Sequence, residues 1–139
     1  MSYTGNATGA LNSYTQVAVQ TGVGAASPHR LIEMMLQAAL DKIAAARGYM
    51  SQGMIVKKAE HIISAVAIVE GLRVSLDLEK GGEIAGNLFA LYDYMERRLT
   101  EANASNDVAI LDEMSSLIKT IKEAWDAIPQ AVQDGHPSR

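Results

Sequence analysis

The 139-residue chain contains no proline between Pro28 and Pro129, and only Pro137 lies beyond that stretch. Proline inside a helix removes a backbone hydrogen bond and clashes with the preceding turn, so a stretch of this length without proline permits several long helices. No part of the stretch alternates between apolar and polar residues for long enough to indicate a strand. We therefore predict an all-α protein.

Apolar residues recur at steps of three and four along four segments of this stretch, which is the spacing of amphipathic helices. The first two helices are predicted over about residues 28–50 and 54–79, with Ser27 capping the first. The third is predicted to follow Gly81-Gly82 and to run to about residue 103. The fourth is predicted to run from the capping Asp107 to Pro129. The core stripe of the third helix is predicted to consist of Ile84, Leu88, Leu91, Met95 and Leu99.

The predicted helices are joined by turns of a few residues, which forces neighbouring helices to pack antiparallel. The simplest topology is an antiparallel up-down four-helix bundle, which we assign to residues 27–129. Residues 1–26 are rich in small and polar residues and are predicted to form a mobile arm, with Leu11, Tyr14 and Val17 on a short amphipathic turn. Residues 130–139 are predicted to be a flexible tail.

The composition argues against most kinds of catalysis. The chain has no cysteine, and its three histidines are scattered without partners at metal-ligand spacing. Neither a glycine-rich phosphate loop nor a nucleophile elbow occurs, so we predict no cofactor, no metal and no enzymatic activity. The first-turn residue His29 is predicted to be exposed.

The charge pattern argues against nucleic acid as a partner, since the formal net charge is -4. The basic pairs Lys57-Lys58 and Arg97-Arg98 are predicted to be solvated helix faces. No signal peptide and no membrane-spanning segment is indicated, so we predict a cytoplasmic protein without membrane insertion.

His61 raises one alternative, because histidine-phosphotransfer domains are also four-helix bundles with a reactive histidine midway along a helix. In such domains a lysine and a glycine usually follow the histidine shortly afterwards. Here His61 is followed by Ile62, Ile63, Ser64 and Ala65, so the sequence disfavours this function.

The helices carry more apolar residues than one stripe each requires. The surplus comprises Ile63, Ala67, Ile68, Val74, Phe89, Tyr92, Tyr94, Ile110 and Leu117. These residues could thicken the core, or they could form exposed apolar grooves that bind another polypeptide chain. Both interpretations remain open from composition and periodicity.

Four residues are candidates for contact with a partner chain. Ile63, Phe89 and Leu117 are the groove candidates, whereas Leu88 and Trp125 are predicted to be mainly structural. Asn87 lies among apolar neighbours, and its amide could pair with the unsatisfied backbone of an extended ligand. An exposed asparagine without a role is the alternative.

Several motifs together resemble the flagellar secretion chaperone family FliS, over the chain from about Leu11 to Ile128. The sequence departs from the family pattern at Leu36, where an aromatic residue is frequent, and at Ile63-Ser64, where Lys-Ala is frequent. The motifs are Tyr14-x-x-Val17, Ala26-Ser27-Pro28-His29-x-Leu31-Ile32-Glu33-Met34, Leu76-Asp77-x-Glu79-Lys80-Gly81-Gly82-Glu83-Ile84-Ala85-x-Asn87-Leu88 and Leu91-Tyr92-Asp93-Tyr94-Met95.

The resemblance implies a cytoplasmic chaperone that holds the disordered C-terminal segment of flagellin in its apolar grooves. Such binding would prevent premature polymerisation and deliver flagellin to the type III export gate protein FlhA. The resemblance also implies that the N-terminal arm covers part of the groove in the free chaperone, and that Leu11 and Tyr14 contact the export gate. A general helical adaptor, or a chaperone for another secreted subunit, remains the alternative.

Overall fold

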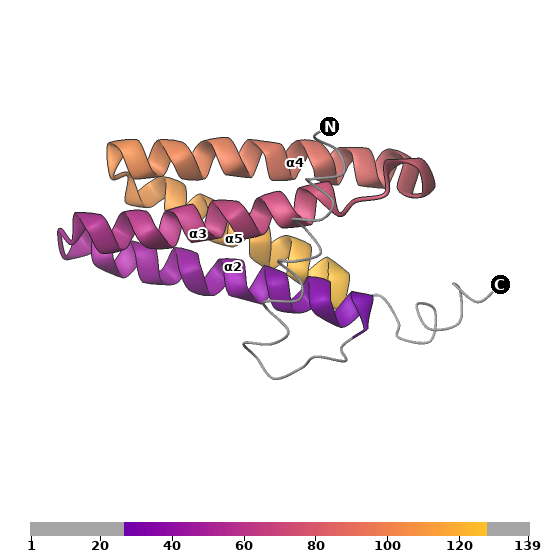
Figure 1. Cartoon of the computed structure of the whole chain (residues 1–139), viewed down its shortest axis with the longest axis horizontal. Coiled ribbons are helices and arrows are strands. Elements are labelled where there is room, and N and C mark those ends of the chain that lie inside the picture. The colour runs from indigo at the N-terminus through magenta and orange to yellow at the C-terminus, as the bar shows by residue number, and fades with distance from the viewer. Residues whose placement is uncertain (1–26, 128–139) are drawn as a thin grey trace, which may run out of the picture.

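The computed structural model describes residues 27–127, and every regular element in this range is an α-helix (Figure 1). The helices are α2 (Pro28–Ser51), α3 (Ile55–Val74), α4 (Leu78–Ser105) and α5 (Val108–Asp126). The predicted arm with Leu11 and Tyr14, and the predicted tail, lie outside the described residues.

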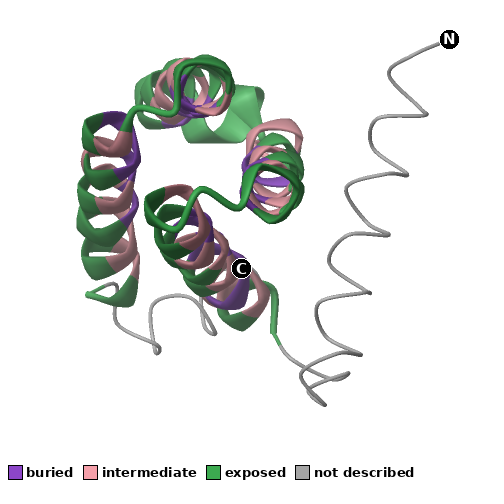
Figure 2. Cartoon of the chain, turned by 90° about the vertical axis from the view of Figure 1, so that its left-hand side faces the viewer, coloured by how far each residue is buried: buried purple, intermediate pink, exposed green. Residues whose placement is uncertain are grey.

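The four helices form the predicted antiparallel up-down bundle. α2 packs against α3 and α5, and α4 packs against α3 and, less extensively, against α5. In Figure 2 the helices surround a common centre, toward which their buried faces point. The predicted all-α fold is therefore confirmed.

The centre of the bundle is filled by the predicted apolar stripes. Methionine occupies it on three helices, where its flexible side chain fills irregular gaps. The core residues with no exposed surface are Met35, Leu36, Ala39, Ala46, Ala65, Val69, Met95, Leu99, Ala102, Leu111, Met114 and Ile118. Two residues predicted as surplus, Tyr92 and Ile110, also belong to this core, so the thick-core interpretation is correct for them.

Side-chain caps mark the starts of α2, α4 and α5. The hydroxyl of Ser27 accepts a hydrogen bond from the backbone N–H of Arg30 at 3.2 Å, and the carboxylate of Asp107 accepts one from Ala109 at 3.0 Å. Both caps were predicted. Asp77 caps α4 in the same way, accepting from the N–H of Lys80 at 3.0 Å.

The predicted C-terminal ends of two helices, α3 and α4, are wrong. α3 ends at Val74 rather than near residue 79, because Asp77 already starts the next helix. α4 continues to Ser105 rather than to residue 103, and Asn106 ends it in the left-handed conformation, with φ +55°. A short amide side chain tolerates that conformation better than most residues do.

Gly81-Gly82 interrupts the helical pattern as predicted, and the interruption lies near the start of α4, between its first turn and the rest of the helix. Gly82 has φ +56° and ψ −131°, which kinks the helix at this point. That combination of angles is open almost only to glycine, because a Cβ would clash with the backbone. The kink therefore depends on the residue type at position 82.

We expect Gly82→Ala to lower the free energy of unfolding by about 1–3 kcal/mol, since alanine is strained at this backbone conformation. Gly86→Ala is the matched control, because Gly86 lies in the regular part of the same helix and an added Cβ would meet nothing within 4 Å. That control should stabilise the protein by about 0.5–1 kcal/mol. Urea denaturation followed by circular dichroism measures both, and equal effects of the two substitutions would contradict the strain at Gly82.

Candidate partner-binding surface

The apolar stripe of α4 loses its cover toward the N-terminal end of the helix. Met95 and Leu99 are fully buried, Leu88 and Leu91 are half-buried, and Ile84 is 73% exposed. The prediction that Ile84 belongs to the core is therefore wrong. Large apolar side chains left uncovered on a folded bundle mark a surface suited to a partner chain.

The reason is that the first turns of α4 extend past the end of α3, as Figure 1 shows. Arg73 lies in the last turn of α3, and its side chain reaches Phe89 and Glu96 of α4. Residues of α4 that precede Phe89 therefore lie beyond the last turn of α3. In this region the small side chain of Ala85 is still buried, whereas the larger side chain of Ile84 beside it is exposed.

Phe89 lies at the seam between α3 and α4. The guanidinium carbon of Arg73 is 5.3 Å from the centre of the Phe89 ring, and Arg73 Nε is 2.6 Å from Glu96 Oε2. Burial raises the pKa of Glu96 and outweighs the opposing effect of Arg73. The hydrogen bond to Glu96 in turn raises the pKa of Arg73. Phe89 is half-buried, and the ion pair between Arg73 and Glu96 lies beside its ring. Phe89 therefore supports the packing of α3 on α4.

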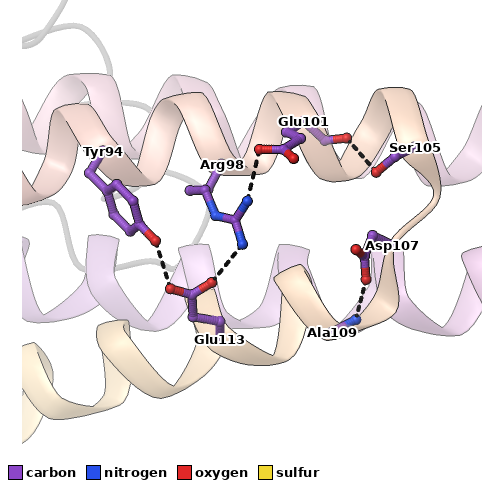
Figure 3. A network of polar contacts seen from close by, with 7 residues as sticks. All are labelled: Tyr94, Arg98, Glu101, Ser105, Asp107, Ala109 and Glu113. Carbon is purple, nitrogen blue, oxygen red and sulfur yellow. Dashed lines mark hydrogen bonds and ion pairs between the residues drawn. The ribbon is translucent and has the colours of Figure 1, made fainter.

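A polar network joins α4 to α5 (Figure 3). The Tyr94 hydroxyl donates to Glu113 Oε2 at 2.7 Å, and Arg98 donates to Glu113 Oε1 at 3.0 Å and to Glu101 Oε1 at 2.8 Å. Tyr94 first, and then Arg98, lowers the pKa of the Glu113 carboxyl by hydrogen bonding to its charged form. This network fixes the register of the two helices at their Asn106 end.

Asn87 and Leu117 continue the same seam on the other side of the network. Asn87 lies seven residues before Tyr94, and Leu117 lies four residues after Glu113, so each shares a helix face with its partner in the network. Asn87 is exposed, whereas Leu117 is half-buried and packs against the core. We define the seam surface as Ile84, Asn87, Leu91 and Leu117.

The fourth candidate is not part of this surface. Ile63 is 62% exposed and lies on the outer side of α3, away from the core. Phe89 therefore lies between α3 and α4, and Ile63 lies by itself. Helical spacing places Asn87 on the face of α4 that carries Tyr94, and Leu117 on the face of α5 that carries Glu113. Ile84 was missed as a surface residue because its spacing continues the core stripe, and spacing does not reveal where a neighbouring helix ends.

Comparison with known proteins identifies the family. The family model described as "Flagellar protein FliS" matches residues 10–132 of the chain. The chain belongs to the FliS family. The flagellar secretion chaperone FliSB of Pseudomonas aeruginosa is 48% identical over 119 residues, which cover 86% of this chain and 94% of that protein. FliS of Salmonella typhimurium is 46% identical over 119 residues, covering 85% of this chain and 88% of that protein.

Membership of the FliS family confirms the resemblance seen in the sequence motifs. The relatives are named as secretion chaperones, which indicates a role without catalysis. Within residues 27–127, no three histidine or acidic side chains gather where they could hold a metal ion. Over the same range, no helix combines the length and apolar character needed to cross a membrane.

A second surface of this FliS-family bundle is a depression of about 440 Å³ between α2 and α5. It differs from the seam surface because most of its lining is polar or charged. The lining residues are Gln37, Leu40, Asp41, Ala44, Ser115, Lys119, Lys122, Glu123 and Asp126. This mixture of charges is poorly suited to an apolar peptide face.

The histidines on α2 and α3 are engaged within the bundle. Nδ1 of His61 lies 2.8 Å from the backbone oxygen of Lys57, and its ring lies 5.1 Å from that of Tyr49. The prediction that His29 is exposed is wrong, because its ring stacks on Trp125 with centroids 4.7 Å apart. Lys58, predicted to be solvated, is also buried, with only 3% of its surface exposed.

Proposed function

We propose that this chain is a cytoplasmic chaperone that binds the disordered C-terminal segment of flagellin, prevents its premature polymerisation and delivers it to the export gate protein FlhA. Membership of the FliS family supports the general role as a flagellar secretion chaperone. The observation that supports the binding mode is the uncovered stripe of α4, on which Ile84 is 73% exposed.

The seam surface suits a ligand that folds as it binds. An amphipathic helix placed between α4 and α5 would cover Ile84 and Leu91 and would extend the bundle's own packing pattern. A disordered segment loses conformational freedom when it binds, so it needs a long contact to reach useful affinity. We therefore propose that flagellin continues from the seam surface over the outer face of α3, where Ile63 lies.

Asn87 is proposed to satisfy the ligand backbone. Its side chain carries two N–H donors and one carbonyl acceptor, so it can pair with both groups of an extended peptide unit. It is exposed in a part of α4 whose neighbours, Ile84 and Leu88, are apolar. Those neighbours would exclude water around such a hydrogen bond and increase the effect of losing it.

The export-gate contact is proposed for Leu11 and Tyr14, on the basis of the family resemblance. Both residues lie outside the described part of the chain. If the contact resides there, the arm acts separately from the seam surface. Flagellin capture and gate docking should then respond to different substitutions.

We expect Ile84→Asp to weaken binding of a flagellin C-terminal peptide by about tenfold or more, because it puts a charge into the apolar contact. Ile63→Asp and Asn87→Ala should weaken it less, and Leu117→Ser should affect both binding and stability. Phe89→Ser should act mainly on stability through the packing beneath Arg73. Fluorescence anisotropy with a labelled peptide measures the affinities, and thermal melting by circular dichroism measures the stability of each variant.

Two controls make this experiment specific. Ala104→Asp places the same charge at an exposed position near the opposite end of α4 and should bind flagellin like the unmodified protein. Tyr14→Ala should keep flagellin binding and lose binding to FlhA. Unchanged affinity of folded Ile84→Asp and Asn87→Ala would show that flagellin binds elsewhere, and binding of a different flagellar subunit alone would favour the alternative function.

A further inference from the structure

The depression between α2 and α5 lies along two contacts that join these helices. Toward one end, Arg47 Nε of α2 lies 2.7 Å from Asp112 Oδ1 of α5, and toward the other the ring of Trp125 stacks on that of His29. The lining contributed by α2 comes from residues 37–44, which lie between these two contacts, and α5 supplies the other wall. A segment of chain lying in the depression would therefore touch both helices at once.

The depression holds charges that the bundle leaves without an ion pair. Asp41 accepts a hydrogen bond from Gln37 at 2.9 Å, but it forms no ion pair within residues 27–127. Lys119 is exposed and has no ion pair in that part of the chain either. Lys122, by contrast, is paired with Asp126 at 3.0 Å. The two walls thus offer a cation on α5 and a carboxylate on α2 to an occupant of the depression.

The chain that follows α5 begins beside this depression. Asp126, the last residue of α5, itself contributes to the lining, and residues 128–139 continue from there. Pro129 has no backbone N–H and restricts the residue before it to extended conformations, so the helix is expected to stop there. Proline is also favoured at the second position of a β-turn, which here would comprise residues 128–131. Such a turn directs the chain back along α5.

We propose that residues 131–136 lie in the depression, antiparallel to α5, with Asp134 beside Lys119 and His136 beside Asp41. A β-turn brings Ala131 back to about the level of Ile128. An extended chain advances about 3.3 Å per residue and a helix rises about 1.5 Å per residue. Asp134 then lies about 10 Å back along α5, at the level of residues 121–122, where the long side chain of Lys119 reaches it.

The same spacing brings His136 to Asp41. His136 lies about 17 Å back along α5, which is the level of residue 117. Asp41 precedes Arg47 by six residues on α2, and the ion pair of Arg47 with Asp112 fixes how the two antiparallel helices align. Asp41 is therefore at about the level of residue 118. Side chains two residues apart in an extended chain point to the same side, so Asp134 and His136 can both face the bundle.

The charges on α5 also disfavour a different register. If the segment slid toward the end of α5, Asp134 would approach the carboxylates of Glu123 and Asp126, both of which line the depression. Like charges placed together oppose such an arrangement. The register that brings Asp134 to Lys119 is therefore the one that places unlike charges together.

This contact belongs to the chain itself and not to the part that matches the family. The family model matches residues 10–132, so Asp134 and His136 lie beyond the match. An exposed ion pair contributes little free energy by itself. Because the segment is tethered to α5, however, its local concentration at the depression is in the millimolar range, so a weak contact is enough to populate the docked state.

A spin label near the end of the chain tests the docking directly. The sequence contains no cysteine, so Ser138→Cys provides a single site for a nitroxide. In nitrogen-15 NMR spectra of the full-length free protein, we expect the label to broaden the amide signals of Ala44 and Ser115, which line the depression. The amides of Ile63 and Ala67, exposed on α3, should stay sharp. Spectra of the reduced, diamagnetic label serve as the reference.

Charge reversal in the labelled protein tests the register. Lys119→Glu and Asp134→Lys should each lower the ratio of docked to undocked protein about threefold or more, because each places like charges together. The double variant Lys119→Glu/Asp134→Lys should restore the broadening, since the exchanged charges are again complementary. Lys57→Glu and Glu60→Lys, at exposed positions of α3, are controls with the same changes in net charge and should leave the broadening unchanged.

Each outcome supports or overturns the proposal. Broadening that is confined to the last turn of α5, or equal on all helices, would show that residues 131–136 do not lie in the depression. Broadening at Ala44 and Ser115 that persists in both single reversals, or that the double variant fails to restore, would rule out the pairing of Asp134 with Lys119. Flagellin and the export gate are absent from the experiment, so its result is independent of the proposed function.

Discussion

Trp125→Ala is expected to lower the free energy of unfolding by about 2–4 kcal/mol, below the full effect of removing a buried tryptophan because the ring is half-buried. The indole joins the end of α5 to the start of α2. Its Nε1–H donates to the backbone oxygen of His29 at 2.9 Å, and its ring stacks on the His29 imidazole at an interplanar angle of 12°. It also packs against the core.

Trp125→Phe separates the parts of this effect. Phenylalanine keeps an aromatic ring against His29 and the core but has no donor for the His29 carbonyl, so we expect a loss of about 1 kcal/mol. Urea denaturation followed by circular dichroism gives both values. If Trp125→Ala proved as mild as Trp125→Phe, the ring would contribute little to holding α5 on α2.

The second large loss of stability is expected from substitutions around Lys58, a buried cation that has no carboxylate partner. Its Nζ donates to the backbone oxygen of Asn103 at 2.7 Å and to Asn103 Oδ1 at 2.8 Å, and no acidic side chain of residues 27–127 pairs with it. Asn103→Ala removes one of these two acceptors from a buried cation. We expect it to destabilise the protein by about 1.5–3 kcal/mol.

Lys58→Met should be milder than Asn103→Ala, which is the informative comparison. Methionine retains much of the apolar stem and removes the charge that needs the acceptors. Once Lys58 is methionine, the further change Asn103→Ala should have little effect, so the two substitutions should be strongly non-additive. Additive losses of stability would show that Asn103 and Lys58 act independently.

The helices could be predicted from the sequence because local signals define them. The apolar steps of three and four and the capping residues Ser27 and Asp107 each act within one helix. The four helices and both caps were confirmed. The end of α3 was misjudged because Leu76 continues the apolar spacing. The side chain of Asp77 caps α4, so a new helix begins there although the apolar spacing continues.

The errors at the surface share a different cause. The burial of Ile84 and Lys58 does not follow from the spacing within their own helices. It depends on which part of a neighbouring helix lies opposite each residue. α4 extends past α3, which exposes Ile84, while the end of α4 covers Lys58. His29 was expected to be exposed because it lies in the first turn of a helix, but its ring stacks on Trp125, which lies far away along the sequence. Such contacts between distant segments leave no trace in a local pattern.

The flagellar partner could be named only through the family motifs, since periodicity indicates a groove but not its occupant. The most direct measurement is a calorimetric titration of the full-length chain with a peptide of the flagellin C-terminal segment, repeated at several temperatures. We expect saturable one-to-one binding with a strongly negative heat-capacity change, because the peptide buries apolar surface as it folds on the bundle. A peptide from the flagellin N-terminal segment should not bind. Absence of binding to the C-terminal peptide, or equal binding to both peptides, would contradict the proposal that this chain is a flagellin chaperone.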